Sequence, residues 1–529
     1  MEPDYLILGS GLSALSFGAL MAKAGRRVRI LEAHYHPGGY GHTFTPDQKN
    51  HRWNFNAQLH YVWNCGEGQP VNRLLKKLGL EREVTFEEYD SNGYDRMRMP
   101  GFSLDIPYNY DELIDRLSRS FPKSRRNIRD FITEVKNVGE GIAALPTIHN
   151  LYTMIQRPTK INKYFYLLKH LNSTLQDVFD HHNLPIEAQT LIALQWPDFL
   201  TPPKNLSFLA WTGLFSGYSN GAYYPTKHFE HVINSLTDLI KRNKGEILYD
   251  RRVIDFILEG NKVRGVKTKN IENERNTGFY PDTNNENGIE EYLGKNIVSN
   301  IDPKRTVEMI GSDIFSKKVL RKLDYDYSPS NFMAYLVVEG IDLRNYGFGK
   351  SNLFHTEEPD LNNVFNKMYN IADYSKPSFA MTVPTLLTKE RGDCPDNQQI
   401  VELLTVANYK YFKTLEQTST VDYIDKKREI LDSLLNIIER DYVPNIREKI
   451  VLKITGTPST NERFCSSPHG NSYGSDLTPR NFGPNRLNHE TSLKNLYFCN
   501  ASSGYPGFAG SIGTGVRLYE ILSGDKISD

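Results

Sequence analysis

The stretch that decides the fold is YLILGSGLSALSFGALMAKAGRRVRILE, residues 5–32. The apolar runs at 5–8 and 28–31 each predict a short buried strand. Between them lie a G-x-G-x-x-A turn, residues 9–14, and a series of small and apolar residues, 15–24, that predicts a helix. This order of strand, turn, helix, strand and acid is typical of a dinucleotide-binding site.

Each part of this stretch can contact a particular part of a dinucleotide. The glycines allow a tight turn and a close approach of the backbone to a pyrophosphate, and the helix N-terminus offers free N–H groups and a positive dipole. Glu32 follows about 20 residues after the turn, where its carboxylate can accept hydrogen bonds from ribose hydroxyls. The alternative is an ordinary tight turn between a strand and a helix. The candidate binding residues here are Gly9, Ser10, Gly11, Leu12, Ser13, Ala14, Glu32 and Ala33.

Composition narrows the class of protein. A chain of 529 residues is too long for one compact core, so two or more domains are expected. Lys and Arg together number 63, as do Asp and Glu, so net charge gives no attraction to nucleic acid. The four cysteines form no C-x-x-C pair, which favours a reduced, cytoplasmic setting. We therefore expect no nucleic-acid partner and no metal site.

Contact with a membrane is predicted to be peripheral. We expect no signal peptide, because the first strand begins at about residue 5, and no run of 18 apolar residues that could span a bilayer. Residues 151–171 are basic and aromatic, and Lys160, Lys163 and Lys169 could meet anionic headgroups while residues 164–168 enter the interface. The alternative is a helix packed on its own domain with solvated lysines. If residues 151–171 do contact a membrane, we expect the protein to lie on the inner face of that membrane.

Two further glycine-rich segments stand out. HPGGYGHTF, residues 36–44, follows Glu32 closely. Near the C-terminus, GYPGFAGSIGTG, residues 504–515, lies between a predicted strand, 495–498, and a predicted helix, 511–522. This is a second glycine-rich turn from a strand into a helix. In contrast, residues 270–294 are polar and are expected to form a long surface excursion outside the core.

Together these segments resemble the glutathione-reductase-type flavoproteins, in the branch of phytoene desaturases, carotenoid isomerases and retinol saturases. Further motifs are similar to that branch and occur in the same order. They are FNAQLHY at 55–61, NGAYYP at 220–225, VSNIDP at 298–303 and TPSTNERF at 457–464. The resemblance thus extends over nearly the whole chain.

The resemblance implies an α/β fold in which a glutathione-reductase-type Rossmann FAD-binding domain is joined to a second, mixed α+β substrate domain. The FAD-binding domain is expected to be discontinuous and to comprise residues 1–66, 225–312 and 455–529. Residues 67–224 and 313–454 are expected to form the substrate-binding domain and to carry any helices that contact a membrane.

The resemblance also implies the cofactor and its ligands. The expected cofactor is FAD, bound non-covalently because no His or Cys lies in an attachment motif, with NAD(P)H as a candidate electron donor. His60 and His42 lie where the family approaches the flavin, which makes them candidate catalytic residues; the alternative is that both are structural hydrogen-bonding groups. Further cofactor-binding residues implied are Gly38, Gly39, His42, Thr43, Val253, Asn500, Gly510, Ser511 and Ile512.

The implied activity is that of an FAD-dependent oxidoreductase acting on carbon–carbon bonds of a long apolar polyene such as a carotenoid or retinoid. Desaturation, saturation and cis–trans isomerisation remain open, as does the oligomeric state. Two alternatives use the same architecture. One is a flavin amine oxidase acting on a soluble substrate, and the other is a non-catalytic escort protein that binds isoprenoid lipids. The escort would not need both glycine-rich turns intact.

Overall fold

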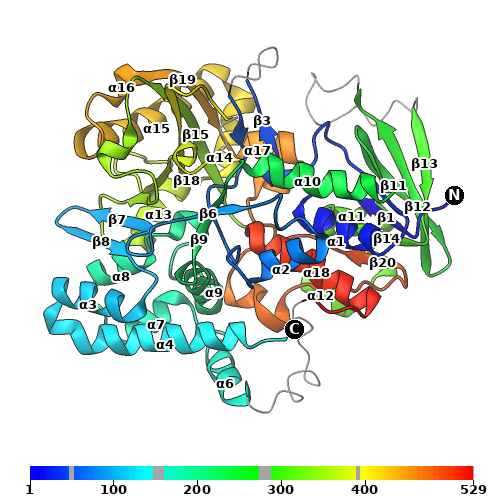
Figure 1. Ribbon diagram of the computed structural model, residues 1–529, viewed down its shortest axis with the longest axis horizontal. Helices are drawn as coiled ribbons and strands as arrows, with labels where there is room; N and C mark the ends of the chain where they lie inside the picture. The colour runs from blue at the N-terminus through cyan, green and yellow to red at the C-terminus, as the bar shows by residue number, and fades with distance from the viewer. Residues whose placement is uncertain (47–52, 147–159, 273–287, 389–392, 528–529) are drawn as a thin grey trace.

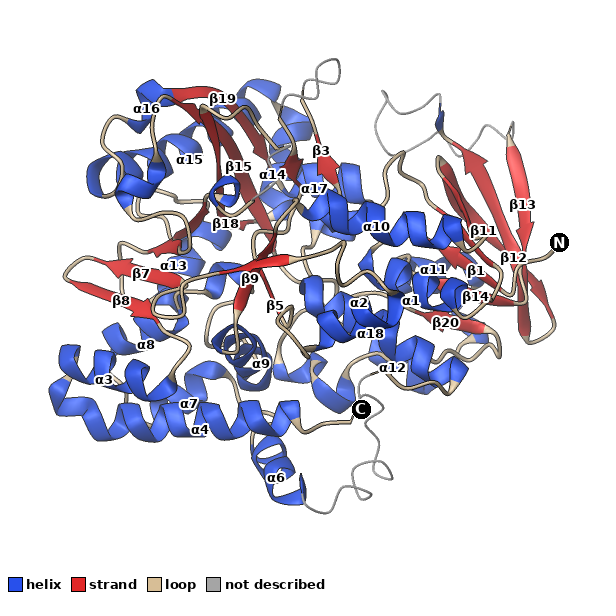
Figure 2. Ribbon diagram, viewed as in Figure 1, coloured by secondary structure: helices blue, strands red, loops and turns tan. Residues whose placement is uncertain are grey.

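The computed structural model describes residues 1–46, 53–146, 160–272, 288–388 and 393–527. Two large sheets organise it, one at each side of the molecule in the view of Figures 1 and 2, with helices packed between and around them. The first sheet is parallel and contains the N-terminal strand. The second is longer, mixed and made mostly from the middle of the chain.

The parallel sheet has five strands in the order β10-β2-β1-β14-β20. They are β10 (Glu246–Leu248), β2 (Val28–Leu31), β1 (Tyr5–Leu8), β14 (Asn296–Ser299) and β20 (Leu496–Phe498). Neighbouring strands run parallel throughout. The predicted strands at 5–8 and 28–31 form as expected, and β1 lies at the centre of the sheet.

Both faces of this sheet are covered, which explains why β1 is apolar at nearly every position. Ile7 packs in the core that includes helix α1 (Leu12–Lys23). Leu6 and Leu8 point the other way and pack with Phe256 and Val266 of a three-stranded antiparallel sheet. That sheet comprises β11 (Arg251–Glu259), β12 (Lys262–Asn270) and β13 (Ile289–Leu293).

Three helices cover the opposite face of the parallel sheet. Helix α1 packs along both α10 (Phe229–Arg242) and α18 (Gly507–Ser523). Because α1 and α18 both follow parallel strands, their N-termini lie at the same, carboxyl edge of the sheet. The glycine-rich turns at the two ends of the chain are thereby brought together.

The mixed sheet has seven strands in the order β19-β15-β18-β17-β16-β7-β8. All pairs are antiparallel except that of β16 and β7. The strands are β7 (Asp95–Met99), β8 (Phe102–Ile106), β15 (Ser330–Glu339), β16 (Asn352–His355), β17 (Phe379–Thr382), β18 (Gln398–Ala407) and β19 (Ile450–Gly456). Strands β15 and β18 are buried along nearly their whole length.

A helical layer lies beside this sheet (Figure 1). Its long members are amphipathic, and α4 buries Phe131, Ile132, Val135 and Val138 on one face. The helices are α3 (Tyr110–Ser120), α4 (Arg125–Ala143), α6 (Ile161–Lys169), α7 (Leu175–His181), α8 (Ile186–Ala193), α9 (Phe208–Ser219), α14 (Tyr409–Thr418) and α15 (Thr420–Asp441). Helix α2 (Pro70–Leu78) instead packs against α18 and α1.

Shorter elements connect these layers. Two small sheets join the loops between them, and their strands are β3 (Thr43–Phe44) with β4 (Phe55–Asn56), and β5 (Val62–Trp63) with β9 (Ala222–Pro225) and β6 (Phe86–Glu88). The remaining helices are α11 (Pro303–Ile310), α12 (Lys317–Leu323), α13 (Leu361–Phe365), α16 (Ile446–Lys449) and α17 (Pro458–Cys465).

Two expectations about local structure need correction. The first helix begins at Leu12 and not at residue 15, because Gly11 in extended conformation caps it directly after the turn. The polar segment 270–294 is not wholly a surface excursion: its end forms β13, which pairs with β12. Residues 273–287 of that segment lie outside the described residues.

The strands of the parallel sheet all come from 1–66, 225–312 and 455–529, the three segments assigned to one domain. Strand β19 crosses the expected boundary at 454/455 and pairs with β15 of the other sheet. The division of the chain into two domains remains a prediction. Within the described residues, no helix is both long and apolar enough to cross a membrane.

Candidate active site

Glu32 ties the turn after β1 to the end of β2. Its Oε2 accepts hydrogen bonds from the backbone N and the Oγ of Ser10, at 2.7 and 2.5 Å, and its Oε1 accepts one from the backbone N of His34 at 2.7 Å. Burial raises the pKa of Glu32, and these hydrogen bonds oppose the rise. The carboxylate therefore holds the G-x-G-x-x-A turn in place from the neighbouring strand.

The N-terminus of α1 is the part of the candidate site that suits a phosphate. No side chain caps this helix, and Gly11, its N-cap residue, donates its backbone N–H to Oδ1 of Asn300 at 3.0 Å. A Cβ on Gly11 would lie 2.6 Å from that same Oδ1, so glycine is required here. Backbone N–H groups at such an end favour an anion such as a phosphate. Ser13 and Ala14 lie in this first turn.

Helix α18 presents a second N-terminus without a side-chain cap, and it begins at Gly507. The helix contains the candidate residues Gly510, Ser511 and Ile512, and the Ile512 carbonyl accepts a hydrogen bond from Ser16 Oγ of α1 at 3.3 Å. Thus two uncapped helix ends lie on adjacent helices at one sheet edge. This arrangement suits a ligand with negative charge at two points.

The glycine-rich loop at 36–44 packs against the first turn. The backbone N of Gly38 donates to the Ser10 carbonyl at 2.9 Å, and a Cβ on Gly39 would lie 3.3 Å from the Cα of Gly11. The Oγ1 of Thr43 is buried and has no hydrogen-bond partner in the described part of the chain. A buried hydroxyl of this kind is suited to bind a polar group of a ligand.

The remaining candidate cofactor residues lie around this cradle. Val253 lies on β11, which meets the end of β2 where Arg251 N donates to the Glu32 carbonyl at 2.8 Å. Ala33 follows Glu32 directly. The Asn500 side chain is already engaged: its Oδ1 accepts from the backbone N atoms of Ser502 and Ser503, and its Nδ2 donates to the Ile301 carbonyl. Asn500 therefore shapes the loop before α18.

The two candidate catalytic histidines are not brought together. The His42 ring lies 5.2 Å from that of His34, on the side of Glu32, and its Nδ1 is 2.7 Å from the Gly39 carbonyl. Burial lowers the pKa of His42, which keeps the ring neutral. His60 instead lines a small cavity beside the seven-stranded sheet. Of the two, His60 is the one that lines a cavity.

This cavity measures about 10 Å³, close to the space of one water molecule. His60 Nδ1 lies 2.7 Å from Oε2 of Glu402, while the His60 Nε2 is buried with no partner among the described residues. A carboxylate of this kind fixes the tautomer and orientation of an imidazole ring. The cavity is lined by His60, Tyr61, Asp198, Phe354, Ala380, Thr382, Glu402 and Leu404. A large substrate fits only if these side chains move apart.

A second polar group adjoins the cavity and was not identified in the sequence. The Tyr61 hydroxyl lies 3.0 Å from Oδ2 of Asp95 and 2.8 Å from Oδ2 of Asp198. Burial raises the pKa of Asp95 to about 6 and also raises that of Asp198. Asp95, Asp198 and Glu402 are far apart in the chain and form no motif. The one local signal was the His60–Tyr61 pair in the FNAQLHY segment.

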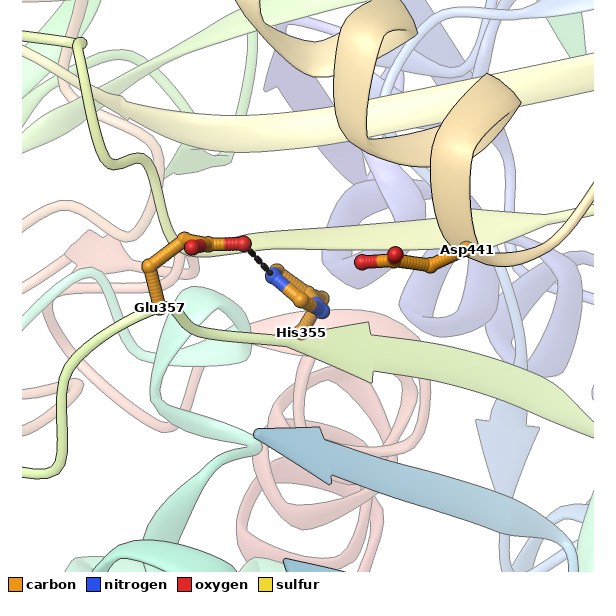
Figure 3. A group of neighbouring side chains, drawn as sticks. All are labelled: His355, Glu357 and Asp441. Atoms are coloured by element: carbon orange, nitrogen blue, oxygen red, sulfur yellow. Dashed lines mark hydrogen bonds and ion pairs between the residues drawn. The ribbon is translucent and has the colours of Figure 1, made fainter. Parts of the chain in front are cut away.

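A separate group of potential metal ligands has a structural explanation. His355, Glu357 and Asp441 place their ligand atoms within 4.8 Å of one another (Figure 3). The Arg440 guanidinium lies 2.6 Å from both carboxylates and supplies the compensating positive charge. His355 uses Nε2 toward Glu357 and Nδ1 toward the Tyr442 hydroxyl. We interpret the group as an ion-pair link between β16 and the end of α15.

Comparison with known proteins gives three findings. Residues 7–78 match the family described as an NAD(P)-binding Rossmann-like domain. All-trans-retinol 13,14-reductase of Danio rerio is 22% identical over 96% of this chain and 84% of its own. Prolycopene isomerase 2 of an Oncidium hybrid cultivar is 21% identical over 96% of this chain and 81% of its own. These similarities support the resemblance to the phytoene desaturase and retinol saturase family. Relatives named for a reductase and for an isomerase align over nearly all of the chain.

The Rossmann-like match and the likeness to solved structures confirm the expected α/β fold with a Rossmann domain of glutathione reductase type. A solved structure of putrescine oxidase shares the fold with a TM-score of 0.63, covering 99% of this chain and 100% of that one at 14% identity. The expectation that the chain is an enzyme of this family is also confirmed. The roles of individual residues remain predictions.

Proposed function

We propose that this protein is an FAD-dependent oxidoreductase or isomerase that changes carbon–carbon double bonds in a long apolar polyene. The observation that carries the proposal is the near full-length similarity to two kinds of enzyme, an all-trans-retinol reductase and prolycopene isomerases. The substrates in those names are both conjugated isoprenoids. Saturation and isomerisation are therefore the two reactions to test first.

The residues of the cradle fit a dinucleotide with a flavin. The turn from Ser10 to Ala14 would hold the pyrophosphate, Glu32 and Ala33 the adenosine ribose, and β11 at Val253 the adenine side. Gly38, Gly39, His42 and Thr43 would lie along the middle of the cofactor, and residues 510–512 with Asn500 near its flavin. When bound, FAD supplies hydride transfer to or from carbon, while the protein supplies orientation and dipoles. NAD(P)H remains a candidate electron donor.

The chain's own groups have distinct parts in this proposal. The uncapped ends of α1 and α18 neutralise negative charge on the cofactor. Glu402 orients the His60 ring at the cavity. The apolar members of the cavity wall, among them Phe354 and Leu404, exclude water from the reacting carbons.

The amine-oxidase alternative rests on likeness of fold. Putrescine oxidase shares the architecture at 14% identity, a level that carries no information about substrate. The escort alternative is disfavoured by the cradle itself, because a lipid carrier has no need for two uncapped helix ends and a buried Thr43 hydroxyl that has no partner among the described residues. A flavin absorbance spectrum of the purified protein separates an escort from an enzyme.

The proposal also includes peripheral contact with a membrane, now through apolar residues of α6 and not through its lysines. Residues 151–159 of the segment expected to reach the membrane lie outside the described residues. In α6, Lys163 and Lys169 pair with Glu140 and Glu134 of α4, so part of their charge is already compensated within the protein. The opposite face of α6 exposes Ile161, Phe165 and Leu168. We propose that this apolar face, at the lower edge of the molecule in Figure 1, touches the bilayer.

The cofactor assignment can be tested apart from catalysis by Gly513→Ala. No atom lies within 4 Å of the position that a Cβ would take at Gly513, so the folded chain should tolerate it. In a helix, Ala is more stable than Gly by up to about 1 kcal/mol. If the flavin packs on residues 510–513, the variant should keep or raise its melting temperature after flavin removal, yet bind less FAD. Full FAD content would place the flavin elsewhere.

Activity is tested with two probes. The holoprotein, reduced with dithionite, is incubated with all-trans-retinol or with prolycopene in detergent micelles, and the products are separated by chromatography. A dihydroretinol or a lycopene isomer supports the proposal. Turnover of putrescine with neither polyene converted would favour the amine-oxidase alternative.

A further inference from the structure

The Tyr61 hydroxyl imposes a constraint on two carboxyl groups. It lies within hydrogen-bond distance of both Asp95 Oδ2 and Asp198 Oδ2, at 3.0 and 2.8 Å. A tyrosine hydroxyl has one proton to donate, and an ionised carboxylate can only accept. Both contacts can be hydrogen bonds only if one of the two aspartates is protonated and donates to the Tyr61 oxygen.

The surroundings indicate which aspartate holds the proton. Asp95 also accepts hydrogen bonds from Nε2 of Gln195 at 2.5 Å and from Nδ2 of Asn352 at 2.9 Å, so donors converge on it from two amides as well as from Tyr61. Among the described residues, Tyr61 is the only hydrogen-bond partner of the Asp198 side chain. Donors stabilise a carboxylate, and burial without donors favours the neutral acid. Asp95 is thus the anion and Asp198 the acid.

The protonated carboxyl of Asp198 is placed where it can reach a molecule in the cavity. Asp198 follows Trp196 and Pro197 in a short helical turn, and its carboxyl lines the same cavity as His60. Asp95 is fully buried and does not line the cavity. The hydrogen-bond chain therefore runs from the cavity inward, from Asp198 through Tyr61 to Asp95. Burial and the nearby Asp95 charge raise the pKa of Asp198, which agrees with the hydrogen-bond geometry in assigning it the proton.

We propose that Asp198 is the acid that protonates a carbon of the substrate double bond, with Tyr61 and Asp95 holding it in position. The proposal rests on the proposed function. In this step the O–H bond of Asp198 breaks, and the π electron pair of the substrate forms a new C–H bond. Asp198 becomes a carboxylate, and the positive charge spreads over the remaining conjugated carbons.

The protonated substrate can become product in two ways, and atoms and electrons balance in each. If the cation gains a hydride, with both its electrons, from a reduced flavin, the double bond is saturated, and Asp198 regains a proton from solvent. If the bond rotates and the same proton returns to Asp198, the product is an isomer and no electrons are exchanged. In both cases Asp198 becomes a carboxylate that is separated from the Asp95 carboxylate only by the Tyr61 hydroxyl. The repulsion between the two favours rapid return of a proton to Asp198.

The location of the proton is tested first, without substrate. Infrared spectra of the wild-type holoprotein at pH 7 should contain the carbonyl stretch of a protonated carboxyl group that is missing in Asp198→Asn. Other buried acids, Glu32 among them, contribute to both spectra and cancel in the difference. Asp198→Ser provides the same comparison if Asp198→Asn does not fold. A difference spectrum without this band overturns the proposal.

The catalytic role is tested with retinol and prolycopene in D₂O. Wild-type dihydroretinol should carry deuterium at the carbon that Asp198 protonates, whereas a lycopene isomer formed by return of the same proton should carry none. Asp198→Asn should lower turnover on the order of 10²-fold or more, the contribution of a positioned acid, with unchanged FAD content and unchanged reduction by dithionite. Undiminished turnover would overturn the role of Asp198. A wild type that converts neither polyene contradicts the proposed function instead, while the infrared band still decides whether Asp198 is protonated.

Discussion

Glu402 lies 2.7 Å from Nδ1 of His60, and the Nε2 of the same ring is buried with no hydrogen-bond partner in the described part of the chain. A buried nitrogen without a hydrogen-bond partner costs stability. Its place in the cavity wall therefore indicates that the His60 Nε2 binds a group of a ligand. We expect Glu402→Gln to lower polyene turnover about 10-fold or more through loss of ring orientation, because a positioned base or acid contributes about 10²-fold or more.

The measurement for Glu402→Gln is the turnover number together with the flavin spectrum, which should not change. Glu339→Gln is a suitable control, because Glu339 ends the adjacent strand β15 and does not line the cavity. Equal turnover in both variants would mean that the His60–Glu402 pair is only structural.

The strand, turn and helix of the candidate cradle could be predicted from the sequence, whereas the residues around the candidate cavity could not. The cradle depends on local signals: an apolar strand, two glycines at fixed spacing, and an acid that ends the next strand. Asp95 lies on β7 and Glu402 on β18, and Asp198 ends a turn between helices. Each is an ordinary acid in its own segment. They meet only through the strand order of the seven-stranded sheet, which alternating patterns do not specify.

The packing of α6 was equally hard to predict from the sequence. Amphipathic spacing identifies two faces of a helix but does not say which one is covered. Tyr164 and Leu167 are buried, and Tyr164 donates a hydrogen bond to the Ala144 carbonyl of α4. Glu134 and Glu140 of α4 then hold Lys169 and Lys163. The apolar residues that remain exposed became clear only from this docking.

The close crossing of α1 and α18 gives a prediction about stability. A Cβ on Gly515 would lie 2.1 Å from Ser16 Oγ and 2.3 Å from the Ser13 carbonyl, so Gly515→Ala forces the helices apart. We expect a loss of about 1–3 kcal/mol in the free energy of unfolding, as for other overpacked cores, and reduced FAD content. Denaturant unfolding and flavin absorbance measure these effects.

Gly213→Ala in α9 is the matched control for Gly515→Ala. Its Cβ would meet only Ile142 Cδ1, at the ordinary distance of 3.6 Å. This variant should be as stable as wild type or more stable by up to about 1 kcal/mol. Equal stability of the two variants would contradict the tight contact between α1 and α18.

A buried cluster on α4 predicts sensitivity to acid. The Glu134 carboxylate lies 2.8 Å from Nε2 of His170 and 2.6 Å from Nε2 of His182, and it also pairs with Lys169. Burial alone would raise the pKa of Glu134, but the hydrogen bonds from these three partners outweigh it and lower the pKa. A lowered carboxyl pKa stabilises the fold above the unfolded value, near 4.3, and this contribution is lost as pH falls below it.

Glu134→Gln should therefore cost about 2 kcal/mol of folding free energy at pH 7, as expected for hydrogen bonds to a charged group. The difference from wild type should shrink as the pH falls from about 5 toward 3. Glu140→Gln on the same helix is the control, because its pair with Lys163 is exposed and worth about 0–1 kcal/mol. A Glu134→Gln penalty that does not change with pH would contradict the ionic origin.

The last prediction concerns how a polyene reaches the protein. Such molecules partition into bilayers, so the protein must collect them there. Phe165 and Leu168 are 67% and 62% exposed on the outer face of α6. Burying two such side chains in a bilayer interface is worth about 3 kcal/mol, or about 10²-fold in partitioning. The double variant Phe165→Glu, Leu168→Glu should lose most of its binding to phosphatidylcholine–phosphatidylserine liposomes in flotation and turn over liposomal retinol more slowly, with an unchanged flavin spectrum.

Val421→Glu on α15 is the control, since Val421 is also 67% exposed. Lys163→Glu should affect flotation little, because Lys163 is held by Glu140. If the double variant floats like wild type, α6 is not the membrane contact.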